Sequence, residues 1–214
     1  ADIVVLGEVH DNPDHHRVQA EIVAALQPAA LVFEMIPQEA EEAVNRLRAE
    51  GASREEIATA LDWEASGWPD FAYYAAVLEA APAARVFGGG QPIEEVRRAA
   101  AVVAAVVFGP DAASYGLDLP LAPGEQAARE ADMLAAHCDA IPVEMLPGLV
   151  EAQRFRDAAL ADAARWARTI TDAPVVVIAG TGHAHRQRGV PAKLAVADPA
   201  LRVLAVGQFE GEPD

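Results

Sequence analysis

The fold of this chain is decided by the stretch Gly7-Glu8-Val9-His10-Asp11-Asn12-Pro13-Asp14-His15-His16-Arg17. The residues just before it, 3–6, are apolar and mostly β-branched, which predicts a buried strand. After it, apolar residues recur at helical spacing. Asn12 followed by Pro13 makes a good helix start, because Asn caps free N–H groups and Pro has none to lose. We therefore expect a strand, a polar turn and a helix from Asp14 to about Gln27. The turn also carries Glu8 and three histidines, which a simple connection does not need.

Four further apolar runs predict the remaining strands, at residues 30–35, 85–87, 175–179 and 202–207. Helical patterns cover residues 38–50, 93–107, 125–137 and 147–169, and Ser53 with Glu56 forms the capping box of another short helix. This alternation predicts an α/β fold: a mostly parallel β-sheet flanked by helices on both faces, with additional helices packed over the C-terminal edge of the sheet. We expect a single domain over residues 1–214, in which the proline- and glycine-rich segment 108–124 is a mobile loop.

Composition excludes several classes of function. The formal net charge of −17 repels phosphate backbones and anionic lipids, so we expect no nucleic-acid partner. Cys138 is the only cysteine, which rules out an intrachain disulfide and a cysteine-rich zinc site. No apolar run reaches the roughly 18 residues of a membrane span. The sequence contains no signal peptide. Because it starts abruptly at a strand, without Met, a removed leader is possible, and the compartment of the protein is left open.

Ligand-type side chains follow three of the predicted strands. Glu8 and His10 come after the first strand, Glu34 ends the second, and His183 follows the fourth. Because parallel strands end at the same edge of a sheet, we expect these four side chains to converge there, with Glu34 largely buried. They would suit a hydrolase in which a divalent metal ion activates water. They would equally suit a metal-free hydrolase in which His10 or His183 is the general base.

Three more histidines lie close to these residues in sequence. His15 and His16 lie in the first turn of a helix, where the helix dipole favours neutral imidazole, the form that binds metals. Core packing is the competing explanation for this pair. His185 lies two residues after His183 and faces either a ligand or solvent.

The helix expected over residues 147–169 contains a polar anomaly. Gln153 and Asp157 fall inside its apolar stripe, and buried polar groups need partners. They either support the site histidines from behind or make a structural bond to a buried loop. Arg186, next to His185, is a further candidate for such a supporting role.

Aromatic residues gather in one segment, whose members are Trp63, Trp68, Phe71, Tyr73 and Tyr74. Such a patch forms either part of the core or a platform for a ligand. Tyrosine oxygen is one of the known ligands of ferric haem. Tyr115, in the predicted mobile loop, offers a second tyrosine oxygen.

With these residues in hand, the chain resembles the ChaN-like haem-binding family of the Tiki/TraB superfamily. The matching segments are Gly7-Glu8-Val9-His10-Asp11-Asn12 with His15-His16, Val32-Phe33-Glu34, Ser66-Gly67-Trp68-Pro69, Gln153 with Arg156-Asp157, and Gly182-His183 with Gly189-Val190-Pro191. The resemblance implies an iron-linked bacterial haem-binding protein, periplasmic or anchored to the outer membrane by a lipid, that can form a homodimer around haem. It also implies relatives that are metal-dependent peptidases or esterases.

Our leading hypothesis is therefore a haem-binding protein of iron or haem acquisition. Its candidate cofactor-binding residues are Tyr74, Tyr115, His15, His16 and His185. The alternative is a hydrolase built on Glu8, His10, Glu34 and His183, with a divalent metal ion as its cofactor. Whether the chain is an enzyme is left open.

Overall fold

The computed structural model of the chain describes residues 1–136 and 139–211. They form two compact units: residues 1–90 with those from 160 onward, and residues 91–159. The first unit contains the strands β1 (Ile3–Glu8), β2 (Ala30–Pro37), β3 (Arg85–Gly90), β4 (Val175–Gly180) and β5 (Val203–Val206), the helices α1 (Pro13–Leu26), α2 (Glu41–Glu50), α3 (Arg54–Ala60), α4 (Trp63–Ser66), α5 (Phe71–Ala80) and α10 (Val190–Ala197), and the 3-10 helices η1 (Gln38–Ala40) and η4 (Thr181–Ala184). The second contains α6 (Ile93–Val102), α7 (Ala104–Phe108), η2 (Pro110–Tyr115), α8 (Pro123–Ala136) and η3 (Val143–Met145), while α9 (Leu146–Thr171) starts in the second unit and ends in the first.

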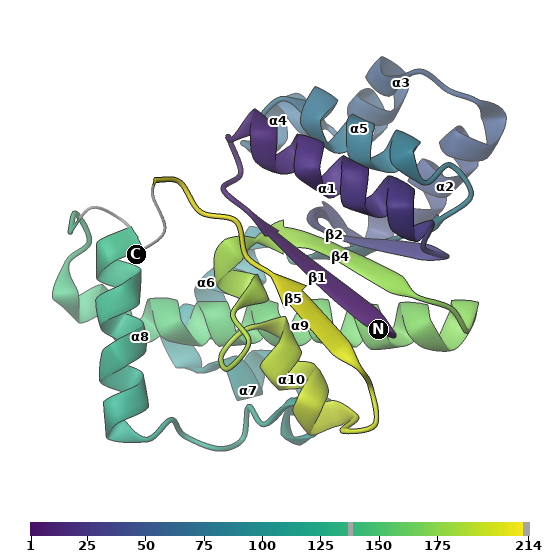
Figure 1. Cartoon of the computed structure of the whole chain (residues 1–214). Helices are drawn as coiled ribbons and strands as arrows, with labels where there is room; N and C mark the ends of the chain where they lie inside the picture. The colour runs from purple at the N-terminus through teal and green to yellow at the C-terminus, as the bar shows by residue number, and fades with distance from the viewer. Residues whose placement is uncertain (137–138, 212–214) are drawn as a thin grey trace. The chain divides into compact units, whose positions relative to one another are not determined.

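The strands form one parallel sheet in the order β3-β2-β4-β1-β5 (Figure 1). The five predicted strands and the α/β class are thus confirmed. Glu8 lies opposite Gly180 in the register, so the last residues of β1 and β4 are neighbours. The regular pairing of β2 with β4 ends at Phe33, and the register of β2 with β3 shifts beyond the same residue. Glu34 therefore leaves the regular ladder close to the ends of β1 and β4.

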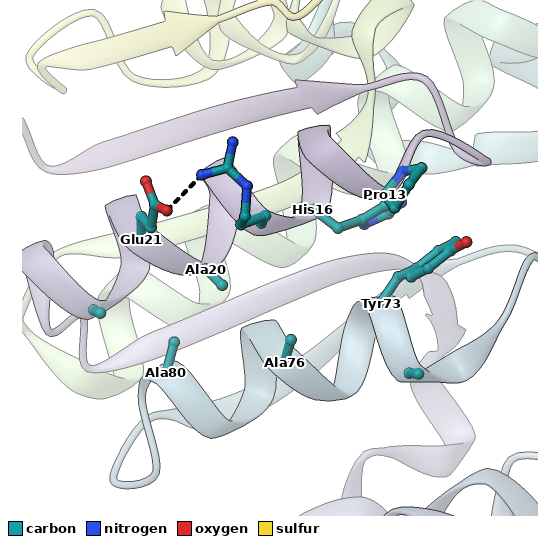
Figure 2. Close-up of a pocket in the computed structure, with 10 residues that line it drawn as sticks. Pro13, His16, Ala20, Glu21, Tyr73, Ala76 and Ala80 are labelled. Carbon is teal, nitrogen blue, oxygen red and sulfur yellow. Dashed lines mark hydrogen bonds and ion pairs between the residues drawn. The ribbon is translucent and has the colours of Figure 1, made fainter.

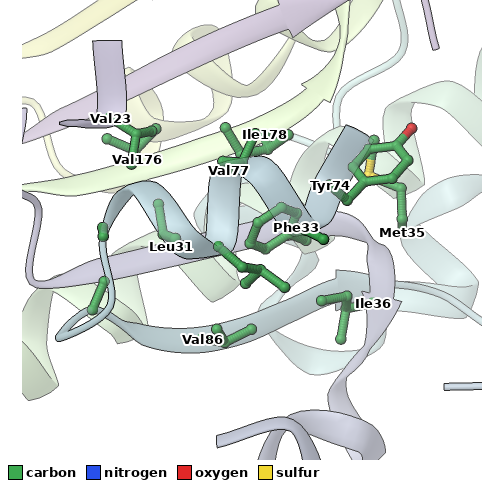
Figure 3. Close-up of a cluster of buried hydrophobic side chains, with 14 of the residues drawn as sticks. Val23, Leu31, Phe33, Met35, Ile36, Tyr74, Val77, Val86, Val176 and Ile178 are labelled. Atoms are coloured by element: carbon green, nitrogen blue, oxygen red, sulfur yellow. The ribbon is translucent and has the colours of Figure 1, made fainter. Parts of the chain in front are cut away.

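Helices cover both faces of the sheet in the first unit. The helices α1 to α5 lie on one face, and α10 with the last turns of α9 lies on the other (Figure 1). The core between the sheet and α1 to α5 joins Val23 of α1, Val77 of α5 and Phe33 of β2 (Figure 3). Burying such side chains stabilises the fold by about 1.5–3 kcal/mol each. The aromatic segment of the sequence forms α4 and the start of α5, with Trp68 in the connection between them.

Some helices differ from their predicted bounds. The helix expected over residues 93–107 breaks at Val103, whose φ of 151° is incompatible with a helix. The helix expected over 125–137 begins earlier, at Pro123, and its predicted last residue, His137, lies with Cys138 outside the described residues. The segment 108–124 contains η2, with Tyr115 buried, and its mobility stays a prediction. No helix in the described part of the chain is long and apolar enough to cross a membrane.

Candidate functional site

Four predicted site residues come together at the carboxyl edge of the sheet. Glu8 ends β1, His10 lies in the turn that follows, Glu34 lies in β2, and His183 lies in η4 directly after β4. Glu8, Glu34 and His183 are buried, whereas the His10 side chain is 35% exposed. Residues far apart in sequence meet here because three parallel strands end at one edge.

Glu8 is the centre of the first half of this cluster. Its Oε1 accepts a hydrogen bond from the Tyr74 hydroxyl at 2.9 Å and lies 2.9 Å from Nδ1 of His10. Its Oε2 lies 3.4 Å from Nδ1 of His16, and Nε2 of His16 donates to the carbonyl of His10 at 2.8 Å. Neither Oε2 of Glu8 nor Nδ1 of His16 has a hydrogen-bond partner among the described residues.

Tyr74 belongs to this buried network. Its side chain is fully buried at one end of the apolar core, as Figure 3 shows. Burial, and after it the neighbouring Glu8 carboxylate, raise the pKa of Tyr74 well above the usual range of a phenol. The hydroxyl therefore keeps its proton and serves as a donor to Glu8. Its role as a haem ligand stays a prediction.

Glu34 and His183 form the second half of the cluster. The backbone N–H of Gly180 donates to Oε2 of Glu34 at 2.7 Å, and Nε2 of His183 lies 3.4 Å from Oε1 of Glu34. A methyl group added at Gly180 would lie only 2.9 Å from Nε2 of His10 and 3.7 Å from Oε2 of Glu34. The lack of a side chain at Gly180 is thus what lets His10 and Glu34 both lie against the end of β4.

The cluster consists of two carboxylate–histidine pairs and not of one ligand set. Within residues 1–136 and 139–211, no group of three or more His, Cys, Asp or Glu side chains is arranged to hold a metal ion. The divalent-metal alternative built on Glu8, His10, Glu34 and His183 therefore gains no support from the geometry. In the metal-free alternative, His10 is the histidine of the two whose side chain is accessible. A catalytic role for either stays a prediction.

The remaining predicted residues of the first unit lie around the cluster. His15 is buried and its Nδ1 accepts a hydrogen bond from the backbone of Val9 at 2.9 Å, which gives it a structural task in the turn. His185 and Arg186 are exposed, and Nδ1 of His185 accepts from the backbone of Gln187 at 3.2 Å. Neither of these two side chains is fixed toward the carboxylate–histidine pairs.

The other predicted residues lie in the second unit. Asp157 is buried and Gln153 is half-buried on α9, as the helical spacing indicated. Tyr115 is fully buried and its ring lies edge-on to that of Phe108, with centroids 5.2 Å apart. The supporting role of Asp157 and Gln153 stays a prediction.

Sequence reasoning missed Tyr73 as a separate candidate. Its ring is partly exposed and stacks on His16, with centroids 5.1 Å apart and planes inclined by 21°. It stands at one end of an open groove of about 400 Å³ between α1 and α5 (Figure 2). The groove is lined by Pro13, His16, Arg17, Ala20, Glu21, Ala24, Ala72, Tyr73, Ala76 and Ala80.

Alanine is the reason that the groove exists. Ala20 and Ala24 follow each other at i, i+4 on α1, and Ala72, Ala76 and Ala80 do so on α5. Residues at this spacing share one helix face, so both helices present short side chains to the same side. This spacing was visible in the sequence. It predicts a shallow apolar channel once the two helices are known to be neighbours.

Comparison with known proteins identifies a family. A family model described as "Haem-binding uptake, Tiki superfamily, ChaN" matches residues 1–194. Among solved structures, the chain is similar to one described as "Cofacial heme binding to ChaN of Campylobacter jejuni", with 20% sequence identity, a TM-score of 0.74, and coverage of 100% of this chain and 84% of the other. The type III effector HopBA1 matches with 16% identity, a TM-score of 0.43, and coverage of 85% and 67%. No curated protein matches.

Proposed function

Because the chain belongs to the ChaN haem-binding uptake family of the Tiki superfamily, we propose that it binds haem in the groove between α1 and α5, with Tyr73 as the iron ligand. The observation that carries this assignment is the exposure of the three tyrosines. Tyr74 and Tyr115 are fully buried, whereas Tyr73 is partly exposed and lines the groove. Haem would supply an iron that Tyr73 would hold through its phenol oxygen.

The groove suits one face of a flat apolar ring. Its volume of about 400 Å³ lies in the range of small-molecule sites, which is about 300–1,000 Å³. Its walls are mostly alanine, so a planar molecule can approach both helix backbones closely. His16 supports the Tyr73 ring from the buried side and is itself tied to the carbonyl of His10. This support limits the positions that the Tyr73 ring can adopt.

A hemin titration of tyrosine variants tests the assignment. The unmodified protein is expected to give a saturable shift of the Soret band. The Tyr73→Phe variant should bind at least about tenfold more weakly, a difference of 1.4 kcal/mol, because the iron loses its oxygen ligand. The Tyr74→Phe and Tyr115→Phe variants should keep the spectrum of the unmodified protein. Loss of the shift in Tyr74→Phe or Tyr115→Phe, with Tyr73→Phe unchanged, would contradict the assignment.

The proposal extends to the biological role. We assign the chain to haem or iron acquisition, acting in the periplasm or on the outer membrane through a lipid anchor outside this sequence. The solved relative is described as binding haem cofacially. We therefore include a homodimer formed on haem binding, to be checked by light scattering at each point of the titration. An unchanged mass at saturation would contradict the dimer alone.

A further inference from the structure

We propose that Arg17 selects the ligand of the groove by binding a carboxylate of the porphyrin. Asp14 and Glu21 hold the guanidinium in position until the carboxylate of the ligand replaces them. The inference rests on the proposed function, because it concerns the same groove. It narrows the ligand to tetrapyrroles with free carboxylates.

Arg17 is placed where an incoming carboxylate would meet it. It lies on α1 directly after His16 and about one turn before Ala20, on the wall of the groove. Its Nη1 donates to Oε1 of Glu21 at 2.7 Å, an ion pair dashed in Figure 2, and its Nε lies 3.3 Å from Oδ1 of Asp14. Its Nη2 makes no hydrogen bond with any described residue. Nη2 of Arg17 is therefore available to donate hydrogen bonds to a ligand.

The positive charge of Arg17 matters because the rest of the protein repels an anionic ligand. The chain carries a formal net charge of −17, so an anionic ligand is repelled by the protein as a whole. Most residues that line the groove are apolar, and Arg17 supplies a permanent positive charge there. Hydrogen bonds to Glu21 and then to Asp14 raise the pKa of Arg17, so it stays cationic. A planar guanidinium also matches a carboxylate with two parallel N–H donors, which a lysine could not do.

The existing ion pairs are weak enough to be exchanged. The side chains of Arg17, Asp14 and Glu21 are 59%, 80% and 64% exposed. Water screens such pairs, and surface ion pairs typically contribute little stability. A carboxylate of a ligand whose ring is already seated in the groove would be held beside Arg17 at high effective concentration. Glu21 then loses its partner at little cost, while its own negative charge opposes the ligand.

The test measures dissociation constants for three ligands: hemin, hemin dimethyl ester, and protoporphyrin IX without iron. Hemin binding is followed at the Soret band, and protoporphyrin binding by its fluorescence. The Arg17→Gln variant should raise the dissociation constant for hemin about tenfold, and Glu21→Gln should lower it about threefold, since these are charge-assisted contacts at a partly exposed site. Neither variant should change binding of the dimethyl ester. The matched controls are Arg98→Gln and Glu95→Gln, an exposed i,i+3 pair on α6.

The three ligands separate failure of this inference from failure of the proposed function. Protoporphyrin IX keeps the carboxylates and lacks the iron, so Arg17→Gln should weaken its binding while Tyr73→Phe leaves it unchanged. An Arg17→Gln variant that binds hemin like the unmodified protein, or that loses hemin and its dimethyl ester equally, would overturn the inference and leave Tyr73 in place. No hemin binding by the unmodified protein would overturn both proposals.

Discussion

Replacing Tyr74 with phenylalanine should destabilise the first unit without affecting haem. The substitution removes one oxygen atom and keeps the ring. The ring contacts therefore remain, with Trp63 at 5.1 Å and with His16 at 4.7 Å between centroids. What is lost is the hydrogen bond of 2.9 Å to Oε1 of Glu8, in a place that water does not reach.

The size of the effect follows from the charge and burial of the acceptor. A hydrogen bond to a charged group contributes about 1.5–3 kcal/mol, so the free energy of unfolding should fall by about 2 kcal/mol at pH 7. Oε1 of Glu8 keeps Nδ1 of His10 at 2.9 Å, which limits the loss. Domains are stable by only about 5–15 kcal/mol, so the change is easily measured.

The difference in the free energy of unfolding between the unmodified protein and Tyr74→Phe should also depend on pH. The pKa of Tyr74 is raised in the folded state, so below about pH 10 the phenol is protonated both folded and unfolded and contributes no pH dependence. Above about pH 10 the unfolded chain loses the proton and the folded chain keeps it, which lowers the stability of the unmodified protein by about 1.4 kcal/mol per pH unit. Tyr74→Phe lacks this group. A difference of about 2 kcal/mol should therefore vanish at roughly pH 11.5.

Urea unfolding followed by tryptophan fluorescence is the suitable assay. The three tryptophans, Trp63, Trp68 and Trp166, all belong to the first unit, so the signal reports on the part that contains Tyr74. The matched control is Tyr73→Phe, which removes the hydroxyl of a partly exposed tyrosine and should change stability by less than about 0.5 kcal/mol. A Tyr74→Phe protein as stable as the control at pH 7, or a difference that does not shrink above pH 10, would refute the account of the Glu8–Tyr74 bond.

Two further substitutions test the local architecture. Gly189→Ala should destabilise the first unit by about 1–3 kcal/mol, because the new methyl group would lie 2.1 Å from the carbonyl oxygen of His183 and that backbone must move. Gly124→Ala, whose methyl group would meet nothing within 4 Å, is its control in thermal unfolding. Ser53→Ala should cost about 1 kcal/mol in the same assay through loss of the capping box with Glu56, and a larger effect would show that Ser53 does more than cap α3.

The sequence was sufficient to place the strands and the carboxylate–histidine cluster. Each strand is a short apolar run, and the direction of parallel strands brings their ends to one edge. Glu8, Glu34 and His183 could therefore be assigned to one edge of the sheet without knowing the strand order, whereas their meeting in one place also required neighbouring strands. The break at Val103 could not be predicted, because the alanine- and valine-rich run over residues 93–107 continues a helical pattern through it. A break of this kind depends on packing that no local pattern contains.

The same limit explains why Tyr73 and Tyr74 were not distinguished. Adjacent residues on a helix point about 100° apart, so one of them faces the core and the other faces outward. The phase of α5 is set by its buried residues, which are Phe71, Tyr74, Ala75, Val77 and Leu78. The outward residues include Ala72, Ala76 and Ala80, which are also apolar, so the sequence shows little contrast between the two faces. A helix with polar residues on its outer face would have shown in the sequence which side faces the core, but its longer side chains would have left no groove. The short side chains that made the phase unreadable are therefore the ones that leave room for a ligand beside Tyr73.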